Sequence, residues 1–293
     1  MPFNEKSRLD PSQVQDRRGR SRGTTMAIGG GGVGIIILVL VLLLGGNPGD
    51  LTNLVGVVPE AQDMNSAEIG DLATECQTGA DANTRQDCAI VGYVNSIQDF
   101  WTDEFTRQGV SYTPAQTVLF SGATEAACGY AQAAMGPFYC QLDQSVYLDL
   151  EFLDDLLNRV GAESGSFAVA YVLSHEYGHH IQNLLGLLDT SGADSTGPQS
   201  MAVYTELQAD CLAGIWVYHA VDTGYLAQIT NEEITQALDA AEAIGDDRIQ
   251  RQTQGYVSPE SWTHGSSEQR QAALEDGLLS GDVNTCETPG WTD

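Results

Sequence analysis

The sequence predicts an α+β fold that is mostly helical, contains a small antiparallel sheet and follows a single transmembrane helix. Three observations lead to this fold class. Residues 27–46 contain no charged side chain. Two long stretches, 167–188 and 201–216, are rich in apolar residues with helical spacing, whereas residues 146–150 show the alternation of a strand. The chain has 293 residues, enough for one sizeable domain and additional segments.

The chain begins with a basic segment. Residues 1–26 are polar and hold six of the 12 basic residues, namely Lys6, Arg8, Arg17, Arg18, Arg20 and Arg22. We expect a disordered cytoplasmic tail here. Residues 27–46 match the roughly 20 residues that span a bilayer. Positive charge before this run predicts a cytoplasmic N-terminus and an extracytoplasmic remainder.

A cleaved signal peptide is the alternative for residues 27–46. Its basic region would be unusually long, no A-x-A cleavage sequence follows the apolar run, and no Cys stands there for a lipid anchor. We therefore favour an uncleaved anchor that makes this a single-pass protein of the cell membrane. Residues 47–66 are predicted to be a linker, which leaves 67–293 as the extracytoplasmic domain.

The charge of this domain is strongly negative. Three of the 40 acidic residues lie in the tail (Glu5, Asp10 and Asp16), so six Arg face 37 acidic residues beyond it, a net charge of −31. Such a surface repels nucleic acid and anionic lipid. We therefore expect no nucleic-acid partner. The oligomeric state has no signature in the sequence.

Six cysteines follow the apolar run: Cys76, Cys88, Cys128, Cys140, Cys211 and Cys286. An even number in an exported domain indicates disulfides. No C-x-x-C pair is present, which argues against a structural zinc site built from cysteines. Of the possible pairings we favour the sequential one, 76–88, 128–140 and 211–286. Each bridge would stabilise the fold by about 3 kcal/mol or more.

Apolar periodicity predicts further elements in chain order: a helix over 84–107, strands over 116–120, 137–142 and 146–150, a loop over 186–199, and helices over 232–244 and 268–279. The strand at 146–150 comes shortly before the apolar stretch at 167–188. If it lies at the edge of its sheet, an extended peptide could pair with its backbone.

The chemistry begins with His175-Glu176-Tyr177-Gly178-His179, an H-E-x-x-H sequence. Residues four apart share one face of a helix, so His175 and His179 can bind the same metal ion. Glu176 can then reach a metal-bound water as general base. This spacing indicates a zinc metallopeptidase with a zincin-like domain. His180 points to another face, and we expect it not to bind the metal.

The surroundings of this motif argue against a solvated pair of histidines. Residues 167–173 before it and the leucine-rich residues 181–188 after it are apolar, as in a core helix. Burying His and Glu side chains in such a helix costs several kcal/mol unless they are paired or bind metal.

A second helical pattern supplies the third ligand. Glu206 and Asp210 are four apart between apolar flanks, and a catalytic zinc usually has three protein ligands. We predict Glu206 as the ligand and Asp210 as the acceptor that orients His175. The rival ligand, His219, lies three turns further on and is interpreted as structural.

A weaker element follows at Thr263-His264-Gly265. His264 could donate to the oxyanion of a tetrahedral intermediate, and Arg270 could orient His264 or the substrate. The alternative is that Ser266 or Ser267 caps a helix and that His264 lies on the surface.

These motifs resemble the putative neutral zinc metallopeptidases, bacterial proteins of the H-E-x-x-H type with an N-terminal membrane anchor. The resemblance covers nearly the whole chain and rests on residues 14–19, 138–140, 146–150, 170–180, 206–214, 263–265 and 269–270. It implies that His175, His179 and Glu206 bind Zn²⁺ and that Glu176 is the base. Gln141 stands where a proline is expected, which affects the strand and not the site. The Glu-x-x-x-Asp and Thr-His elements are also similar to those of the prenyl-protein endopeptidases.

The sequence therefore favours a membrane-anchored zinc endopeptidase with a peptide or protein substrate. Two alternatives remain open at this stage. One is an extracytoplasmic binding or scaffold module that contains zinc without turnover, and the other is an amidase that acts on cell-wall peptides. A purely structural site needs no base at Glu176, which distinguishes the first alternative. Substrate, regulation and the identity of the divalent ion are not encoded in these motifs.

Overall fold

The structure is a computed structural model that describes residues 2–19, 71–159, 161–162, 165–188 and 195–286. Its α-helices are α3 (Leu72–Glu75), α4 (Gly79–Ala82), α5 (Gln86–Arg107), α6 (Leu150–Arg159), α7 (Ser166–Leu184), α8 (Met201–His219), α9 (Asn231–Ala243), α10 (Asp246–Gln254) and α11 (Ser267–Ser280). Short 3-10 turns are η1 (Pro11–Gln13), η3 (Ala133–Met135), η4 (Pro259–Ser261) and η5 (Val283–Cys286). The fold is helix-rich α+β, as the sequence predicts.

The main sheet has the strand order β1-β2-β6-β5, formed by β1 (Val14–Asp16), β2 (Gln116–Leu119), β6 (Ser145–Leu148) and β5 (Phe138–Cys140). Strands β1, β2 and β6 are parallel, and β5 is antiparallel to β6. The expectation of an antiparallel sheet is therefore wrong for most of this sheet. A separate antiparallel hairpin, β3 (Ala123–Ala126) and β4 (Gly129–Gln132), lies between β2 and β5 in the chain.

The strand predicted at 146–150 is not an edge strand. It corresponds to β6, which is hydrogen-bonded to β2 on one side and to β5 on the other. Its residues are all buried, because both of its faces are covered. Within the described sheet, β5 is the edge strand on this side, and it packs against α7.

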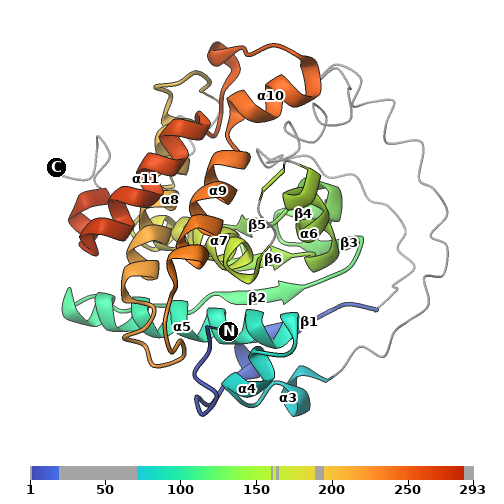
Figure 1. Ribbon diagram of the computed structural model, residues 1–293, viewed down its shortest axis with the longest axis vertical. Coiled ribbons are helices and arrows are strands. Elements are labelled where there is room, and N and C mark those ends of the chain that lie inside the picture. Colours follow the sequence, from blue (N-terminus) through green and yellow to red (C-terminus); the bar gives the residue numbers. More distant parts are fainter. Residues whose placement is uncertain (1, 20–70, 160, 163–164, 189–194, 287–293) are drawn as a thin grey trace.

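Helix α7 lies between the sheet and a layer of helices that includes α8, α9 and α11 (Figure 1). Residues 167–178 of this helix are all buried. Gly178 allows α7 and α8 to approach closely, since a Cβ atom there would lie 2.8 Å from the carbonyl oxygen of Ala209. Helix α7, which carries buried His175 and Glu176, is thus packed closely against α8, the helix that carries Glu206.

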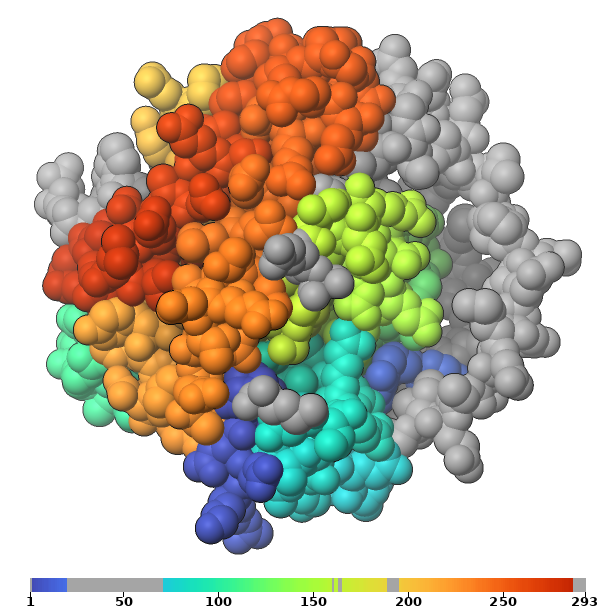
Figure 2. All heavy atoms as spheres, viewed as in Figure 1, coloured from blue at the N-terminus to red at the C-terminus, as the bar shows by residue number. Residues whose placement is uncertain are grey.

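The N-terminal residues 2–19 are part of this fold. Strand β1 pairs with β2, and Phe3 forms a bridge with Leu226. Phe3 is 3% exposed and fills the space left by Gly92 of α5, where a Cβ atom would lie 2.4 Å from the Phe3 ring. In Figure 2 these residues, in blue, lie against the cyan residues of α4 and α5 and an orange segment of the C-terminal half.

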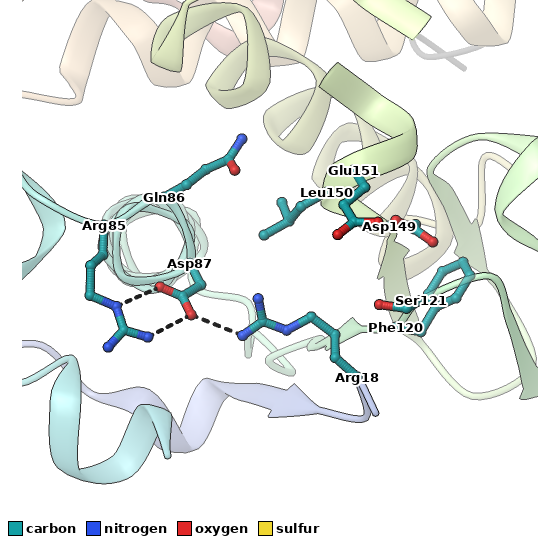
Figure 3. A pocket seen from close by; sticks show the side chains of 9 residues that line it. All are labelled: Arg18, Arg85, Gln86, Asp87, Phe120, Ser121, Asp149, Leu150 and Glu151. Carbon is teal, nitrogen blue, oxygen red and sulfur yellow. Dashed lines mark hydrogen bonds and ion pairs between the residues drawn. The ribbon is translucent and has the colours of Figure 1, made fainter. Parts of the chain in front are cut away.

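Charged and polar contacts fix the same segment. Arg18 Nη2 lies 2.9 Å from Asp87 Oδ2, and Arg85 donates to the same carboxylate (Figure 3). The side chain of Asn95, fully buried on α5, accepts from the backbone N–H of Asp10 and donates to its carbonyl. The expectation of a disordered tail is wrong for residues 2–19, because buried apolar side chains and a partly buried ion pair bind them to the domain.

These contacts join the N-terminal segment to the domain. Residues 2–19 and the described remainder of the chain form one folded unit. The apolar run at 27–46 and the linker at 47–66 lie outside the described residues. Among the helices that the structure does describe, none combines the length and apolar character of a membrane span.

Three disulfides join Cys76 to Cys88, Cys128 to Cys140, and Cys211 to Cys286. This is the sequential pairing that the sequence favours. The third bridge spans 75 residues and ties the C-terminal turn η5 to α8. The region around the third predicted ligand is therefore cross-linked to the end of the described chain.

Candidate metal centre

His175, His179 and Glu206 come together between α7 and α8. One ligand atom from each lies within 4.8 Å of the others. Nε2 of His175 is 3.2 Å from Glu206 Oε2, and Nε2 of His179 is 3.5 Å from Glu206 Oε1. Two ring nitrogens and a carboxylate thus face one point.

The local sequence explains this convergence. His175 and His179 are separated by one turn of α7, and their ring centroids are 4.7 Å apart. Helix α8 begins after Ser200, whose side chain accepts from the N–H of Val203. Because the helix begins there and packs along α7, Glu206 reaches the same face as the two histidines.

The charges at this point are tightly coupled. Burial alone would raise the pKa of Glu206, but the neighbouring histidines outweigh it and hold the pKa well below its ordinary value. Burial would also lower the pKa of His175, whereas Asp210 and Glu206 raise it to about 10. Glu206 is therefore an ionised, enclosed carboxylate that is 6% exposed. The charge of such a group must be compensated; protonated His175 compensates it in the described structure, and a bound metal ion would do so in its place.

Asp210 occupies the position that the sequence predicts for it. Its Oδ1 lies 2.8 Å from Nδ1 of His175 and accepts from the hydroxyl of Tyr171 at 2.6 Å. Burial raises the pKa of Asp210, but Arg270 and His175 outweigh it and lower the pKa to about 2. An ionised acceptor on Nδ1 keeps a proton of His175 there, so Nε2 is the nitrogen that would give up its proton to bind a metal.

Arg270 lies behind the site and not in it. Its Nε donates to Asp210 Oδ2 at 2.8 Å and its Nη2 to Oδ1 at 2.9 Å, and the residue is 3% exposed. The same Nη2 is 3.3 Å from the hydroxyl of Tyr171. The prediction that Arg270 orients His264 or the substrate stays a prediction. The guanidinium compensates the buried charge of Asp210.

Glu176 follows His175 on α7 and is 5% exposed. Burial raises its pKa, and the charge of Glu206 adds to this, while His175 and His179 act in the opposite direction. The result is a raised pKa. A carboxyl group whose proton affinity is increased in this way is suited to accept and return a proton near neutral pH.

His264 is also enclosed near the centre, since its charge acts on Glu206. Its Nδ1 faces Asp246 Oδ1 at 3.3 Å, and burial, which lowers its pKa, is outweighed by Asp246 and Glu206, so the pKa is raised. Oδ2 of Asp246 accepts from the backbone N–H groups of Thr263, His264 and Gly265. His264 is not a surface residue, and Ser266 caps α11 at the same time.

Asp246 is a residue that the sequence analysis missed. It stands in the first turn of α10, where an acidic residue is ordinary, and it is 18 positions from His264. Gln182, which accepts from Nδ1 of His179 at 2.8 Å, was missed as well. Its i+3 spacing from His179 on α7 is the one local signal for this contact.

The other histidines have structural partners. Nε2 of His219 is 2.9 Å from the carbonyl oxygen of Gly281, and the ring stacks on Phe100. His180 lies between the hydroxyl of Tyr139 and the carbonyl oxygen of Thr113. A second group of potential ligand atoms in the described chain, around Asp87, includes Cys76 and Cys88, whose sulfurs are joined in a disulfide.

The donor set fits zinc. Two histidine nitrogens and one carboxylate are the ligands of many catalytic zinc sites, which leave one coordination position open. The enclosed anionic Glu206 and the orientation of His175 by Asp210 agree with that assignment. The centre thus offers the donor set of a catalytic-type zinc site, and no cysteine belongs to this group of ligand atoms.

The comparison with protein families agrees with this class. Residues 3–289 match the family described as "Putative neutral zinc metallopeptidase", and the chain belongs to this family. An uncharacterized protein of Mycobacterium tuberculosis is 44% identical over 222 residues, which cover 73% of this chain and 74% of the mycobacterial protein. Uncharacterized protein YpfJ of Escherichia coli is 37% identical over 293 residues, covering 97% of each chain. No solved structure matches the chain.

Proposed function

We propose that this protein is a zinc-dependent endopeptidase whose metal is held by His175, His179 and Glu206. The observation that carries this proposal is the convergence of these three ligand atoms within 4.8 Å of one another, beside the buried Glu176. When bound, zinc supplies a Lewis acid that polarises a carbonyl group and acidifies water.

The side chains around the centre have separate roles in this proposal. Glu176, whose pKa is raised by burial, takes a proton from the attacking water and later delivers it to the leaving amine. The pKa of His264 is raised by Asp246 and Glu206 against the effect of burial, so the ring can carry a proton on both nitrogens; Nδ1 then faces Asp246, and Nε2 can donate to the developing oxyanion. Asp210 orients His175, and Arg270 keeps Asp210 ionised.

The edge strand β5 supports a peptide as substrate. Tyr139 of β5 is hydrogen-bonded through its hydroxyl to His180 and Asn183 of α7, so the strand is fixed beside the helix of the metal ligands. An edge strand offers backbone groups to an extended peptide. Cleavage of proteins and cleavage of cell-wall peptides both remain within this proposal, and the choice of substrate separates them.

We also propose that the domain acts outside the cytoplasm. Three disulfides support an oxidising compartment, and the apolar run at 27–46 supports attachment to the membrane. The packing of residues 2–19 on the domain constrains how the chain meets the membrane, since a single crossing between residues 19 and 71 would separate parts that are in contact.

The deciding experiment compares the purified full-length wild type with Glu176→Gln. Full-length protein is required because residues 2–19 belong to the fold. Metal content is measured first, and then hydrolysis of casein peptides and, in parallel, of muropeptides. We expect one zinc per chain in both proteins and cleavage in the wild type alone. Zinc in both without cleavage of either pool would support a binding module, and no zinc in either would overturn the site.

A further inference from the structure

We propose that Gln182 is the positioning residue of His179, and that it fixes the tautomer in which His179 presents Nε2 to the metal. This inference rests on the proposed zinc site. Asp210 performs the corresponding task for His175, but a neutral amide and not a carboxylate stands behind the second histidine. The two ligand histidines are therefore held by groups of different charge.

The contact to His179 has a defined direction. Oε1 of Gln182 lies 2.8 Å from Nδ1 of His179. An amide oxygen can only accept a hydrogen bond, so Nδ1 must carry the proton if this oxygen faces it. The neutral imidazole then has its lone pair on Nε2, the nitrogen that lies 3.5 Å from Glu206 Oε1.

The orientation of the amide is itself fixed by its other neighbours. Nε2 of Gln182 donates to the backbone carbonyl of Thr205 at 2.7 Å, and this carbonyl has no proton to give in return. If the amide were turned round, two oxygens would face each other in a buried position, because Gln182 is 1% exposed. Two buried acceptors that face each other without a donor are unfavourable, so the amide keeps the orientation that the structure shows.

A second amide confirms the same direction. Nε2 of Gln182 also donates to Oε1 of Gln208 at 3.0 Å, and Nε2 of Gln208 donates to the carbonyl of Cys286 at 3.1 Å. The chain of hydrogen bonds thus runs from the ring of His179 through two buried glutamines to a backbone carbonyl beside the Cys211–Cys286 disulfide. Every member has one possible orientation, so the network holds the ring as well as the proton.

The test measures metal affinity and tautomer and does not depend on turnover. Gln182→Met keeps the size of the side chain but removes the acceptor. We expect its zinc dissociation constant, measured by competition with a chelator, to rise by about 10–100-fold. The control is Gln98→Met, which removes another buried glutamine of the core, bonded to Gln13 and Tyr112, and should leave zinc affinity unchanged.

Nitrogen NMR of the His179 ring in zinc-free protein, at a pH at which the ring is neutral, provides the second readout. We expect the Nδ1–H form in the wild type and a mixture of tautomers in Gln182→Met. Equal zinc affinity of Gln182→Met and wild type, an equal loss in Gln98→Met, or the Nε2–H form in the wild type would each overturn the proposal. The wild-type spectrum decides even if Gln182→Met does not fold. Absence of zinc binding by the wild type would refute the proposed function, while the tautomer would still test Gln182.

Discussion

The guanidinium of Arg270 donates one hydrogen bond to each carboxylate oxygen of Asp210, at 2.8 and 2.9 Å, and both side chains are buried. Asp210 belongs to α8 and Arg270 to α11, so the pair joins two helices directly behind His175. The positive charge of Arg270 compensates the negative charge of Asp210, the carboxylate that orients the predicted ligand His175. The primary role of Arg270 is therefore to stabilise the ionised carboxylate of Asp210 in the interior.

Replacing Arg270 by Met should destabilise the protein strongly. The change removes the guanidinium that donates to both carboxylate oxygens of buried Asp210, and breaking such a pair costs about 3–5 kcal/mol in the free energy of unfolding. Urea denaturation measures this quantity. Arg159→Met is the matched control, because the side chain of Arg159 is 68% exposed and its partner Asp155 is 3.9 Å away. The free energy of unfolding of Arg159→Met should stay close to that of the wild type. A similarly small decrease for Arg270→Met would contradict the role of Arg270 in stabilising Asp210.

His264→Gln should lower kcat without removing the metal. If His264 donates to the oxyanion, its loss should reduce kcat on a cleaved peptide by about 10²–10³-fold, with zinc content unchanged. Asp246→Asn should reduce kcat in the same direction, because Asp246 holds the loop of residues 263–265. His219→Gln serves as the control, since His219 bonds to Gly281 away from the centre. A rise in KM at constant kcat would assign His264 to substrate binding.

The sequence predicts the elements whose apolar pattern is long or strongly periodic. The helix expected over 84–107 is α5, and those expected over 232–244 and 268–279 are α9 and α11. Helix α10 was not predicted, because Ile249 is its one large apolar residue. Strand β1 was not predicted either, because its three residues include a single apolar side chain, Val14, and depend on pairing with a strand 100 positions away.

The direction of the strands and the outer contacts of the site could not be predicted from local sequence patterns either. The parallel pairing of β2 and β6 depends on how the chain between them folds, and the alternation of apolar residues within one strand does not contain that information. His175 and His179 could be predicted because helical spacing places them on one face of α7. Glu206 belongs to α8 and could be predicted because it stands four residues before Asp210 between apolar flanks and because a catalytic zinc usually has three protein ligands. The contact of His264 with Asp246 could not, because the two residues meet through the tertiary fold.

The ion pair of the N-terminal segment should make stability depend on pH. Burial raises the pKa of Asp87, but Arg85 and Arg18 outweigh it and hold the pKa below its ordinary value. Asp87 therefore stabilises the folded state above the ordinary carboxyl pKa of about 4, and this contribution is lost as the pH falls through the lowered value.

Asp87→Asn tests this dependence by comparison with the wild type in urea denaturation at a series of pH values. We expect the difference in the free energy of unfolding to be largest near pH 7 and to shrink below about pH 4. Asp155→Asn, at a side chain that is 69% exposed, should show a small difference at every pH. A difference for Asp87→Asn that does not change between pH 7 and pH 3 would contradict the ion pair.

The sidedness of the N-terminal segment can be tested in intact cells. Phe3, Asp10 and Arg18 all contact parts of the domain, so residues 2–19 and the domain should be exposed to the same compartment. The described chain has no free cysteine, which allows single Cys labels at the exposed positions Lys6 and Leu279. We expect a membrane-impermeant maleimide to label Lys6→Cys and Leu279→Cys to the same extent.

Two other outcomes are informative. If Leu279→Cys is labelled in intact cells and Lys6→Cys is labelled only after the cells are broken, the protein crosses the membrane once and has a cytoplasmic N-terminus. Protection of both would refute the extracytoplasmic location while leaving the packing intact.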